Sequence, residues 1–407
     1  MTTRSDEESQ FEQNNPRAFA AQISSPTALH AKAVPARWDI FCAVVDNFGD
    51  IGVCWRLARQ LADEHHFEVR IWVDDLNTFG HLCPEISTQV ESQMIGLIEV
   101  RKWVQDFPAV LPADVVIEAF ACELPDSYVA AMCLKTISPV WINLEYLSGE
   151  SWVEECHGLA AAQSRSRISK YFFFPGFQLP TGGLLREREL YASLAAFDET
   201  SKSQFWQRLN LALESDEIRV SLFCYDNPVL PALLDCWATH SDEVRLLTTP
   251  GSATAQVSAW LGTPLVEGKV IRKGGLIVQA IPFLSHGEYD KLLWSCDVNF
   301  VRGEDSFVRA QWAQQPFAWQ IYPQSDAAHR RKLDAFLDRY LANFADAEAV
   351  KRFFHAWNGD GDIKSAWLNF AAIRESIRRH GKVWVSELDR AGDLANNLVR
   401  FVQEKLS

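Results

Sequence analysis

The feature that most constrains this chain is an alternation of short apolar runs with longer segments that have one apolar face at helical spacing. The first such unit is a strand over residues 38–45, a turn over 46–52, and a helix with Val53 and Leu57 on one face. Runs of β-branched and aromatic residues that alternate with helices are typical of parallel sheets covered by helices. The sequence therefore predicts an α/β fold of the doubly wound kind.

This alternation occurs in two series, separated by a segment rich in proline and glycine. Before that segment we expect further strands at 67–73, 97–103, 115–119 and 140–144. The segment itself, 175–184, has the composition of a crossing between domains, although an ordinary surface loop has the same composition. After it we expect strands at 218–225, 244–248, 276–284, 297–301 and 317–321, with helices at 228–240, 253–261, 289–294, 306–313, 327–340 and 349–357.

The two series predict two Rossmann-like domains that face a central cleft. We expect an N-terminal domain over residues 37–180 and a C-terminal domain over 181–385, followed by a helix over 386–407 that packs back toward the first domain. Residues 1–36 are polar and lack a periodic apolar face, so we expect a disordered tail there. Ligands of open α/β sheets bind beyond the carboxyl ends of the strands, and we expect the site there.

Composition narrows the classes of function. The chain has 407 residues, 48% of them hydrophobic, and no apolar run approaches the ~20 residues of a membrane helix. Its net charge of −14 argues against a nucleic-acid partner and suits a cationic one. The nine cysteines include no C-x-x-C pair, so we expect reduced thiols and no zinc site. Without a secretion signal the expected location is cytoplasmic.

Two carboxylates, Asp46 and Asp50, lie in the loop that is expected to leave the first strand. This loop lacks the glycine and lysine pattern of phosphate-binding loops. Two acidic groups repel a diphosphate, whereas they attract an ammonium or guanidinium cation. The alternative is a structural role, in which Asp50 caps the following helix and Asp46 stabilises the turn.

A second turn takes the chain from a predicted strand into a helix at Arg302. Arg302 supplies fixed positive charge, Gly303 lets the backbone approach a ligand closely, and Ser306 offers an N–H and a hydroxyl. The unpaired N–H groups of a helix N-terminus can bind phosphate without a metal. The turn therefore predicts a nucleotide-type ligand. The alternative is that Glu304, Asp305 and Ser306 only complement the helix dipole.

Aromatic residues lie near the expected ligand-facing ends of strands in the second series. Phe223, Tyr225 and Phe283 could stack on a base. His286 could form a hydrogen bond with the same base, or it could simply be exposed on a loop. The position of these residues is compatible with both interpretations.

Metal and hydrolase chemistry find no support in the sequence. Asp74 and Asp75 end a predicted strand, and although an acidic pair can bind Mg²⁺, we interpret this pair as a strand-end turn. No group of His and Cys residues has zinc spacing, and no G-x-S-x-G elbow is present. We therefore expect neither a metalloenzyme nor a serine hydrolase.

Several motifs, in register, resemble the bacterial protein-arginine rhamnosyltransferases that modify elongation factor P. The resemblance runs from about Trp38 to the C-terminus and rests on Asp46–Val53, Trp55–Ala58, Asn143–Ser148, Pro175–Phe177, Thr181–Leu184, Val301–Trp312 and Ile321–Gln324. It implies a GT-B glycosyltransferase, with TDP-β-L-rhamnose held by the C-terminal domain and the acceptor protein docked on the N-terminal domain. It also implies inversion at the anomeric carbon and neither a metal nor another cofactor.

The resemblance also implies roles for single residues. Asp50 would be the general base, Asp46 would hold the guanidinium, and Glu304 is a third carboxylate that the family needs. We expect Glu304 to bind sugar hydroxyls rather than phosphate. The implied acceptor contacts are Asp46, Asn47, Phe48, Gly49 and Asp50. The implied donor contacts are Phe223, Tyr225, Phe283, His286, Arg302, Gly303, Asp305 and Ser306, where His286 departs from the glutamine of the family pattern.

Three functions stay open at this point. The first is the arginine rhamnosyltransferase, the second is a GT-B enzyme with a lipid or saccharide acceptor, and the third is a nucleotide-binding protein without catalysis. An enzyme that acts at a membrane would be expected to carry a basic or amphipathic face, which this acidic chain does not display. The sequence therefore favours the first function.

Overall fold

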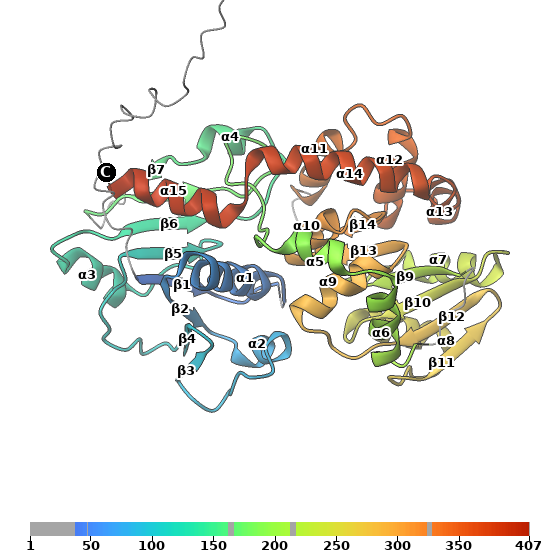
Figure 1. Cartoon of the computed structure of the whole chain (residues 1–407), viewed down its shortest axis with the longest axis horizontal. Helices are drawn as coiled ribbons and strands as arrows, with labels where there is room; N and C mark the ends of the chain where they lie inside the picture. Colours follow the sequence, from blue (N-terminus) through green and yellow to red (C-terminus); the bar gives the residue numbers. More distant parts are fainter. Residues whose placement is uncertain (1–36, 47, 162–166, 212–216, 324–327, 407) are drawn as a thin grey trace, which may run out of the picture. The chain divides into compact units, whose positions relative to one another are not determined.

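The fold contains two mostly parallel sheets (Figure 1). The computed structural model describes residues 37–46, 48–161, 167–211, 217–323 and 328–406. The first sheet has the strand order β3-β4-β2-β1-β5-β6-β8-β7. Its strands are β1 (Arg37–Cys42), β2 (Glu68–Val73), β3 (Ser92–Ile95), β4 (Ile98–Lys102), β5 (Val115–Ala119), β6 (Val140–Leu144), β7 (Ala160–Ala161) and β8 (Lys170–Phe173).

The second sheet has the strand order β11-β12-β10-β9-β13-β14. Its strands are β9 (Ile218–Leu222), β10 (Val244–Thr248), β11 (Val270–Lys273), β12 (Leu276–Ala280), β13 (Val298–Arg302) and β14 (Phe317–Gln320). In each sheet the central strands are parallel and are connected through helices. The predicted α/β fold with two doubly wound sheets is confirmed.

Helices connect the strands and follow the second sheet. They are α1 (Phe48–His65), α2 (Leu76–Leu82), α3 (Asp126–Leu134), α4 (Trp152–Cys156), α5 (Leu190–Ala196), α6 (Glu199–Arg208), α7 (Leu230–Thr239), α8 (Ser252–Leu261), α9 (His286–Ser295), α10 (Asp305–Trp312), α11 (Ala328–Tyr340), α12 (Ala347–Trp357), α13 (Ile363–Ala372), α14 (Arg374–Ala391) and α15 (Leu394–Leu406).

The buried central strands lie where the sequence predicts them, and so does the buried edge strand β14, whereas the exposed edge strands β3 and β11 were missed. β5 and β6 match the predicted ranges residue for residue, because all of their side chains are buried and apolar runs mark them. β3 and β11 were not predicted, and both pair antiparallel with their neighbours. These short strands are mostly exposed, so no apolar run identifies them.

Two predicted helix boundaries are wrong. The helix after β1 begins at Phe48 rather than after Gly52, so Gly49 and Asp50 belong to the first turn of α1 and not to a loop. The single helix expected over 386–407 is two helices, and it breaks at Gly392, whose φ of 76° and ψ of 179° are incompatible with a helix. A glycine near an apolar periodic segment is compatible with a helix that continues through it, as at Gly52, and with a helix that ends there, as at Gly392. Tertiary contacts decide which of the two forms.

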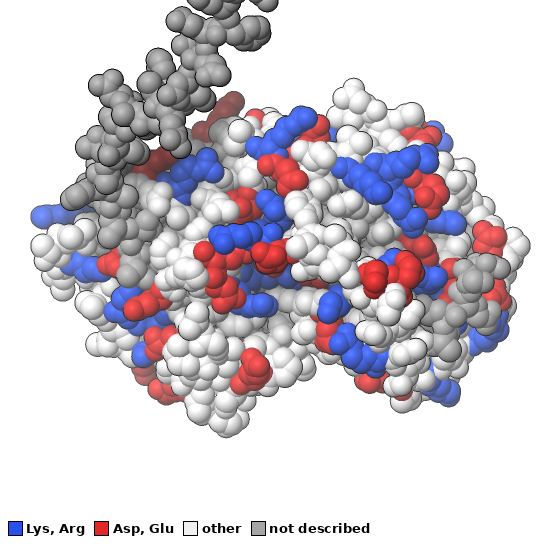
Figure 2. Space-filling model, in the orientation of Figure 1, with Lys and Arg blue, Asp and Glu red and all other residues white. Residues whose placement is uncertain are grey.

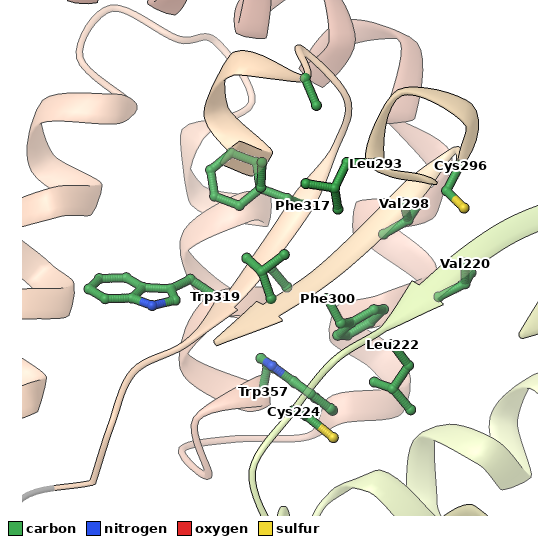
Figure 3. Close-up of a cluster of buried hydrophobic side chains, with 14 of the residues drawn as sticks. Val220, Leu222, Cys224, Leu293, Cys296, Val298, Phe300, Phe317, Trp319 and Trp357 are labelled. Carbon is green, nitrogen blue, oxygen red and sulfur yellow. The ribbon is translucent and has the colours of Figure 1, made fainter. Parts of the chain in front are cut away.

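The core beside β13 fixes the end of that strand (Figure 3). Phe300 of β13 lies between the two neighbouring strands and has its ring 4.6 Å from the ring of Trp357 in α12. Val220 and Leu222 of β9 and Trp357 are fully buried around it. A strand anchored this firmly presents Arg302, its last residue, at a defined position.

The helix α15 contacts α1 and β6 (Figure 1). Gln60 of α1 donates from Nε2 to Asp393 Oδ1 at 3.1 Å, just before α15 begins. The ring of Phe401 lies 5.5 Å from the ring of Phe173 in β8. The chain thus returns, after the second sheet, to cover elements of the first.

Candidate functional site

The carboxylate of Asp50 folds back onto the turn that precedes α1. Its Oδ2 accepts hydrogen bonds from the backbone N–H groups of Val45 and Asp46, both at 2.8 Å. Its Oδ1 accepts from the hydroxyl of Tyr146 at 3.1 Å. The residue is buried, so one carboxylate oxygen is held by the backbone while the other faces Tyr146. Asp50 lies inside the first turn of α1, so it does not cap that helix as the alternative supposed, but ties the preceding turn to it, and Oδ1 is its chemically available oxygen.

Asp46 lies where the carboxyl ends of the two sheets meet. The hydroxyl of Tyr225, which follows β9, donates to Asp46 Oδ2 at 2.5 Å. Burial raises the pKa of Asp46 to about 6, although the Tyr225 hydrogen bond and the charge of Arg302 act in the opposite direction. A Cβ atom on Gly303 would lie 2.6 Å from Asp46 Oδ2, so this close approach requires glycine. The two turns singled out in the sequence are therefore neighbours in space.

The Arg302 turn is held together by its own side chains. The guanidinium of Arg302 lies over the rings of Phe223 and Tyr225, at 4.5 and 4.3 Å from their centroids. The Ser306 hydroxyl donates to Arg302 O at 2.6 Å and accepts from Arg302 N at 3.1 Å. The hydroxyl of Ser306 thus closes the turn, which leaves the Arg302 guanidinium and the first N–H groups of α10 to meet a ligand.

An aromatic cavity lies beside this turn, with a volume of about 60 Å³. The predicted donor residues that line it are Phe223, Phe283, His286, Arg302, Gly303, Asp305 and Ser306. Tyr225, the remaining predicted donor residue, contacts the cavity wall through Asp46. Phe48, which the sequence assigns to the acceptor, lines this cavity together with Gly49, and its ring lies 5.1 Å from the ring of Phe283.

His286 is the first residue of α9 and is buried, with 6% of its surface exposed. The alternative of an exposed loop histidine is therefore wrong. Neither ring nitrogen has a hydrogen-bond partner among the described residues. Burial, followed by the charge of Arg56, lowers the pKa of His286 well below its usual value. A neutral imidazole with free hydrogen-bonding capacity thus faces the aromatic cavity.

An acidic cavity of about 220 Å³ lies on the other side of Asp46 and Gly303. Asp46, Asp50 and Glu304 all line it. Glu304 Oε2 accepts from the backbone N–H of Leu147 at 2.8 Å. Burial, with a smaller effect of Asp50, raises the pKa of Glu304 to about 8. Three carboxyl groups therefore share one pocket, and Glu304 is largely protonated at neutral pH.

Three further residues of the acidic cavity were given no role from the sequence, although two of them, Tyr146 and Tyr322, lie in motifs of the family resemblance. Tyr146 donates to Asp50, and its ring stacks on Phe120 with centroids 4.3 Å apart. Tyr322 and Lys332 line the same cavity. Tyr146 follows the carboxyl end of β6, so the position of the strand could have identified it. Lys332 lies in α11, far along the chain from any strand end, and no local pattern marks it.

Other predicted positions have structural roles or fall outside the described residues. Asp75 caps α2 by accepting from the N–H groups of Asn77 and Thr78, and Asp74 accepts from Val44 N, so the strand-end turn is confirmed. Asn47, an expected acceptor contact, lies outside the described residues, as do Gln324 of the last resemblance motif and the tail over 1–36.

The described part of the chain contains no group of three or more His, Cys, Asp and Glu side chains arranged to hold a metal ion. None of its helices combines the length and the apolar character that a bilayer crossing requires. Figure 2 shows Lys and Arg interspersed with Asp and Glu on the face presented, rather than gathered into one basic surface.

Comparison with known proteins identifies relatives over nearly the whole chain. A family profile described as Elongation-Factor P (EF-P) rhamnosyltransferase EarP matches residues 38–403. A protein-arginine rhamnosyltransferase of Pseudomonas putida is 48% identical over 91% of this chain and 100% of its own length. One from Pseudomonas aeruginosa is 45% identical over 91% of this chain and 100% of its own length.

A solved structure supports the same assignment. It concerns EarP-mediated arginine glycosylation of translation elongation factor EF-P, and it covers 91% of this chain and 99% of its own, with 36% identity and a TM-score of 0.66. The α/β fold with two mostly parallel sheets is thus shared with a solved structure of this enzyme class. The chain belongs to the EF-P rhamnosyltransferase family EarP and is an enzyme of the protein-arginine rhamnosyltransferase class.

Proposed function

We propose that the chain transfers L-rhamnose from TDP-β-L-rhamnose to an arginine side-chain nitrogen of elongation factor P, with inversion at the anomeric carbon and without a metal. One observation carries this proposal. Asp46 and Gly303 line two adjacent cavities and separate them. The first cavity is lined by aromatic rings and Arg302, and the second by three carboxyl groups. An anionic nucleotide sugar suits the first cavity, and a guanidinium suits the second.

The donor would lie in the aromatic cavity. Arg302 and the N-terminus of α10 would hold the diphosphate, because both offer positive charge without a metal. The base would stack between aromatic rings, with His286 as a hydrogen-bond partner. The cavity of about 60 Å³ is smaller than the roughly 300 Å³ of typical ligand pockets, so the rings of Phe48 and Phe283 would part on binding.

The acceptor guanidinium would enter the acidic cavity. Asp46 and Asp50 would pair with its N–H groups, and the approach of a cation would favour ionisation of Glu304. The ring of Tyr146 also lines the pocket, stacked on Phe120 and with Lys332 Nζ 6.0 Å from its centroid, so an entering guanidinium would compete with Lys332 for this ring. This arrangement would fix one guanidinium nitrogen close to the wall formed by Asp46 and Gly303.

The reaction requires an arginine nitrogen to act as a nucleophile although its pKa exceeds 12. No carboxylate can remove the proton beforehand, so proton transfer would accompany attack. The nitrogen would form a bond to the anomeric carbon while the bond from that carbon to the diphosphate oxygen breaks, and TDP would leave with the electron pair. Asp50 Oδ1 would accept the nitrogen's proton, because its other oxygen is held by two backbone N–H groups.

The test is incubation of the purified chain with elongation factor P and TDP-rhamnose, followed by intact-protein mass spectrometry. A gain of one deoxyhexose on elongation factor P is expected, and elongation factor P with its acceptor arginine replaced by lysine should gain nothing. The Asp50→Asn variant should bind TDP and transfer rhamnose far more slowly. A folded wild-type chain that binds TDP-rhamnose but leaves elongation factor P unmodified would contradict the proposal.

A further inference from the structure

A buried ion cluster joins α1 to helices of the second-sheet half. Arg56 of α1 donates from Nε to Asp305 Oδ1 at 2.7 Å and from Nη2 to Asp290 Oδ1 at 3.1 Å. Arg309 of α10 binds the two oxygens of Asp290 at 2.9 and 2.7 Å. Glu187 bridges the arginines, since its Oε1 lies 3.2 Å from Arg56 and its Oε2 lies 2.6 Å from Arg309.

Three charged groups of this cluster are almost fully enclosed, whereas the side chain of Glu187 is 35% exposed. The side chains of Arg56 and Arg309 are 4% and 2% exposed, and that of Asp290 is 8% exposed. Burial opposes the charge of Arg56, but Asp290, Asp305 and Glu187 outweigh it and raise its pKa. Removing one member of such a cluster leaves a buried charge without its partner. The cluster therefore holds its members in one geometry.

The cluster lies at the crossing of α1 and α10. Gly52 precedes Arg56 by about one helical turn, and a Cβ atom there would lie 3.3 Å from Asp305 Cβ. Asp50 lies on the same helix α1, and Asp305 is the first residue of α10. The ion cluster thus stands between the helix with the proposed base and the helix whose N-terminus faces the donor.

We propose that Arg56 is a positioning residue for rhamnose transfer, which fixes α1 with the proposed base Asp50 relative to α10 with its donor contacts. The inference rests on the proposed function and assigns Arg56 no contact with either substrate. Glu187 belongs to the connection between β8 and α5, so the same cluster also binds the segment that links the two sheets to α1. Without Arg56 the acceptor residues and the donor residues are all still present, but their position relative to one another is no longer fixed.

Arg56→Met and Arg56→Lys test this inference through two separate measurements. For Arg56→Met we expect the dissociation constant of TDP, measured by calorimetry, to change by less than about threefold, because the donor contacts remain on α9 and α10. The transfer rate at saturating donor and acceptor should fall by about tenfold or more, since small misplacements of reacting groups are costly. Arg56→Lys keeps a cation for the carboxylates and should recover part of that rate.

Arg70→Met is the matched control. Arg70 is also a buried arginine, bound through two nitrogens to Asp39 at 2.8 and 2.6 Å, but it lies in β2 and not at the helix crossing. The Arg70→Met substitution should lower the melting temperature, while the folded variant keeps the wild-type transfer rate at saturating donor and acceptor. An Arg56→Met enzyme that retains the wild-type saturated rate, or loses it only as far as Arg70→Met does, overturns the proposal.

Amide hydrogen exchange tests the same crossing of α1 and α10 without an activity measurement. In Arg56→Met, exchange at α1 and at the first turn of α10 should become faster, whereas exchange in β10 should stay unchanged. Unchanged exchange at both helices would also overturn the inference. A wild-type enzyme that transfers no rhamnose would contradict the proposed function instead, and the exchange result would still decide the role of Arg56 in the helix crossing.

Discussion

The carboxyl group of Asp46 is enclosed by the hydroxyl of Tyr225 and by the backbones of Gly49 and Gly303. A Cβ atom on either glycine would lie within 2.7 Å of Asp46 Oδ2, so neither position accepts a side chain without a shift. This enclosure keeps part of the water away from the carboxyl group and raises its pKa to about 6. Asp46 is therefore mostly ionised at pH 7 and mostly protonated at pH 5.

This pKa makes a prediction for the pH dependence of transfer. If ionised Asp46 holds the guanidinium, kcat/KM should fall as the pH drops below about 6. The Tyr225→Phe variant loses a hydrogen bond that favours the ionised form, so its acid limb should move to higher pH. The measurement is the pH profile of kcat/KM for both enzymes. Tyr191→Phe, which loses a hydroxyl that donates to Asp389, should leave the limb in place.

Glu304 predicts a pH dependence of stability. Its pKa is about 8 in the folded chain and near 4.5 in an unfolded one, so the folded state holds a proton that the unfolded state releases between these values. The stability that this proton contributes is present below pH 4.5 and is lost as the pH rises through 8.

Glu304→Gln should therefore gain stability relative to wild type as the pH increases from 5 to 8.5. Urea unfolding at several pH values measures this difference. Glu348→Gln, at an exposed carboxylate paired with Arg352, serves as the comparison. Equal pH slopes for the wild-type and Glu304→Gln proteins would show that Glu304 does not retain its proton in the folded state.

At the scale of elements, what the sequence could predict depends on burial. β5 and β6 are buried along their whole length, and their apolar residues identify them exactly where they lie. The predicted start of α1 is wrong because Gly49 and Gly52 suggest a turn, whereas both lie in the helix, where Gly49 closely approaches the side chain of Asp46 and Gly52 that of Asp305 in α10. A glycine required by a neighbouring helix and a glycine required by a turn look the same in a sequence.

The break between α14 and α15 gives a prediction at this scale. Gly392 has φ 76° and ψ 179°, a conformation that residues with a Cβ atom rarely adopt. Gly392→Ala should therefore lower the free energy of unfolding by about 1–3 kcal/mol. Gly80→Ala is the matched control, because Gly80 is helical and its Cβ would meet no other atom closer than 3.9 Å. Gly80→Ala should be neutral or stabilising, and equal effects of both variants would contradict the argument.

At the scale of the whole molecule, the ends of distant segments form the site. Asp46 and Tyr225 are 179 residues apart in the chain, and Arg56 and Asp305 are 249 residues apart. The α/β pattern predicted a site beyond the carboxyl ends of the parallel strands, and both turns follow such strand ends. It could not predict the ion cluster of Arg56, since no local spacing links its members. The domain boundaries proposed from the sequence remain predictions.

The packing of α15 on α1 and β6 predicts how the chain responds to loss of that helix. A chain that ends at Ala391 would expose the faces of α1 and β6 that α15 covers. Hydrogen exchange should then become faster in these two elements, while β9 and β10 of the second sheet keep their protection. Uniformly faster exchange in both sheets would instead show that α15 stabilises the entire structure.

The return of α15 to the first sheet also affects how this protein is made. During synthesis the elements of the first sheet emerge before those of the second, yet one of their covering helices comes from residues 394–406. Until that segment leaves the ribosome, an apolar surface on α1 and β6 faces water or a chaperone. The second sheet, over residues 218–320, is also completed by a later helix, because Trp357 of α12 packs on Phe300, but α12 ends before α15 begins. The first sheet, although translated first, therefore receives its last covering helix after the second sheet has received α12.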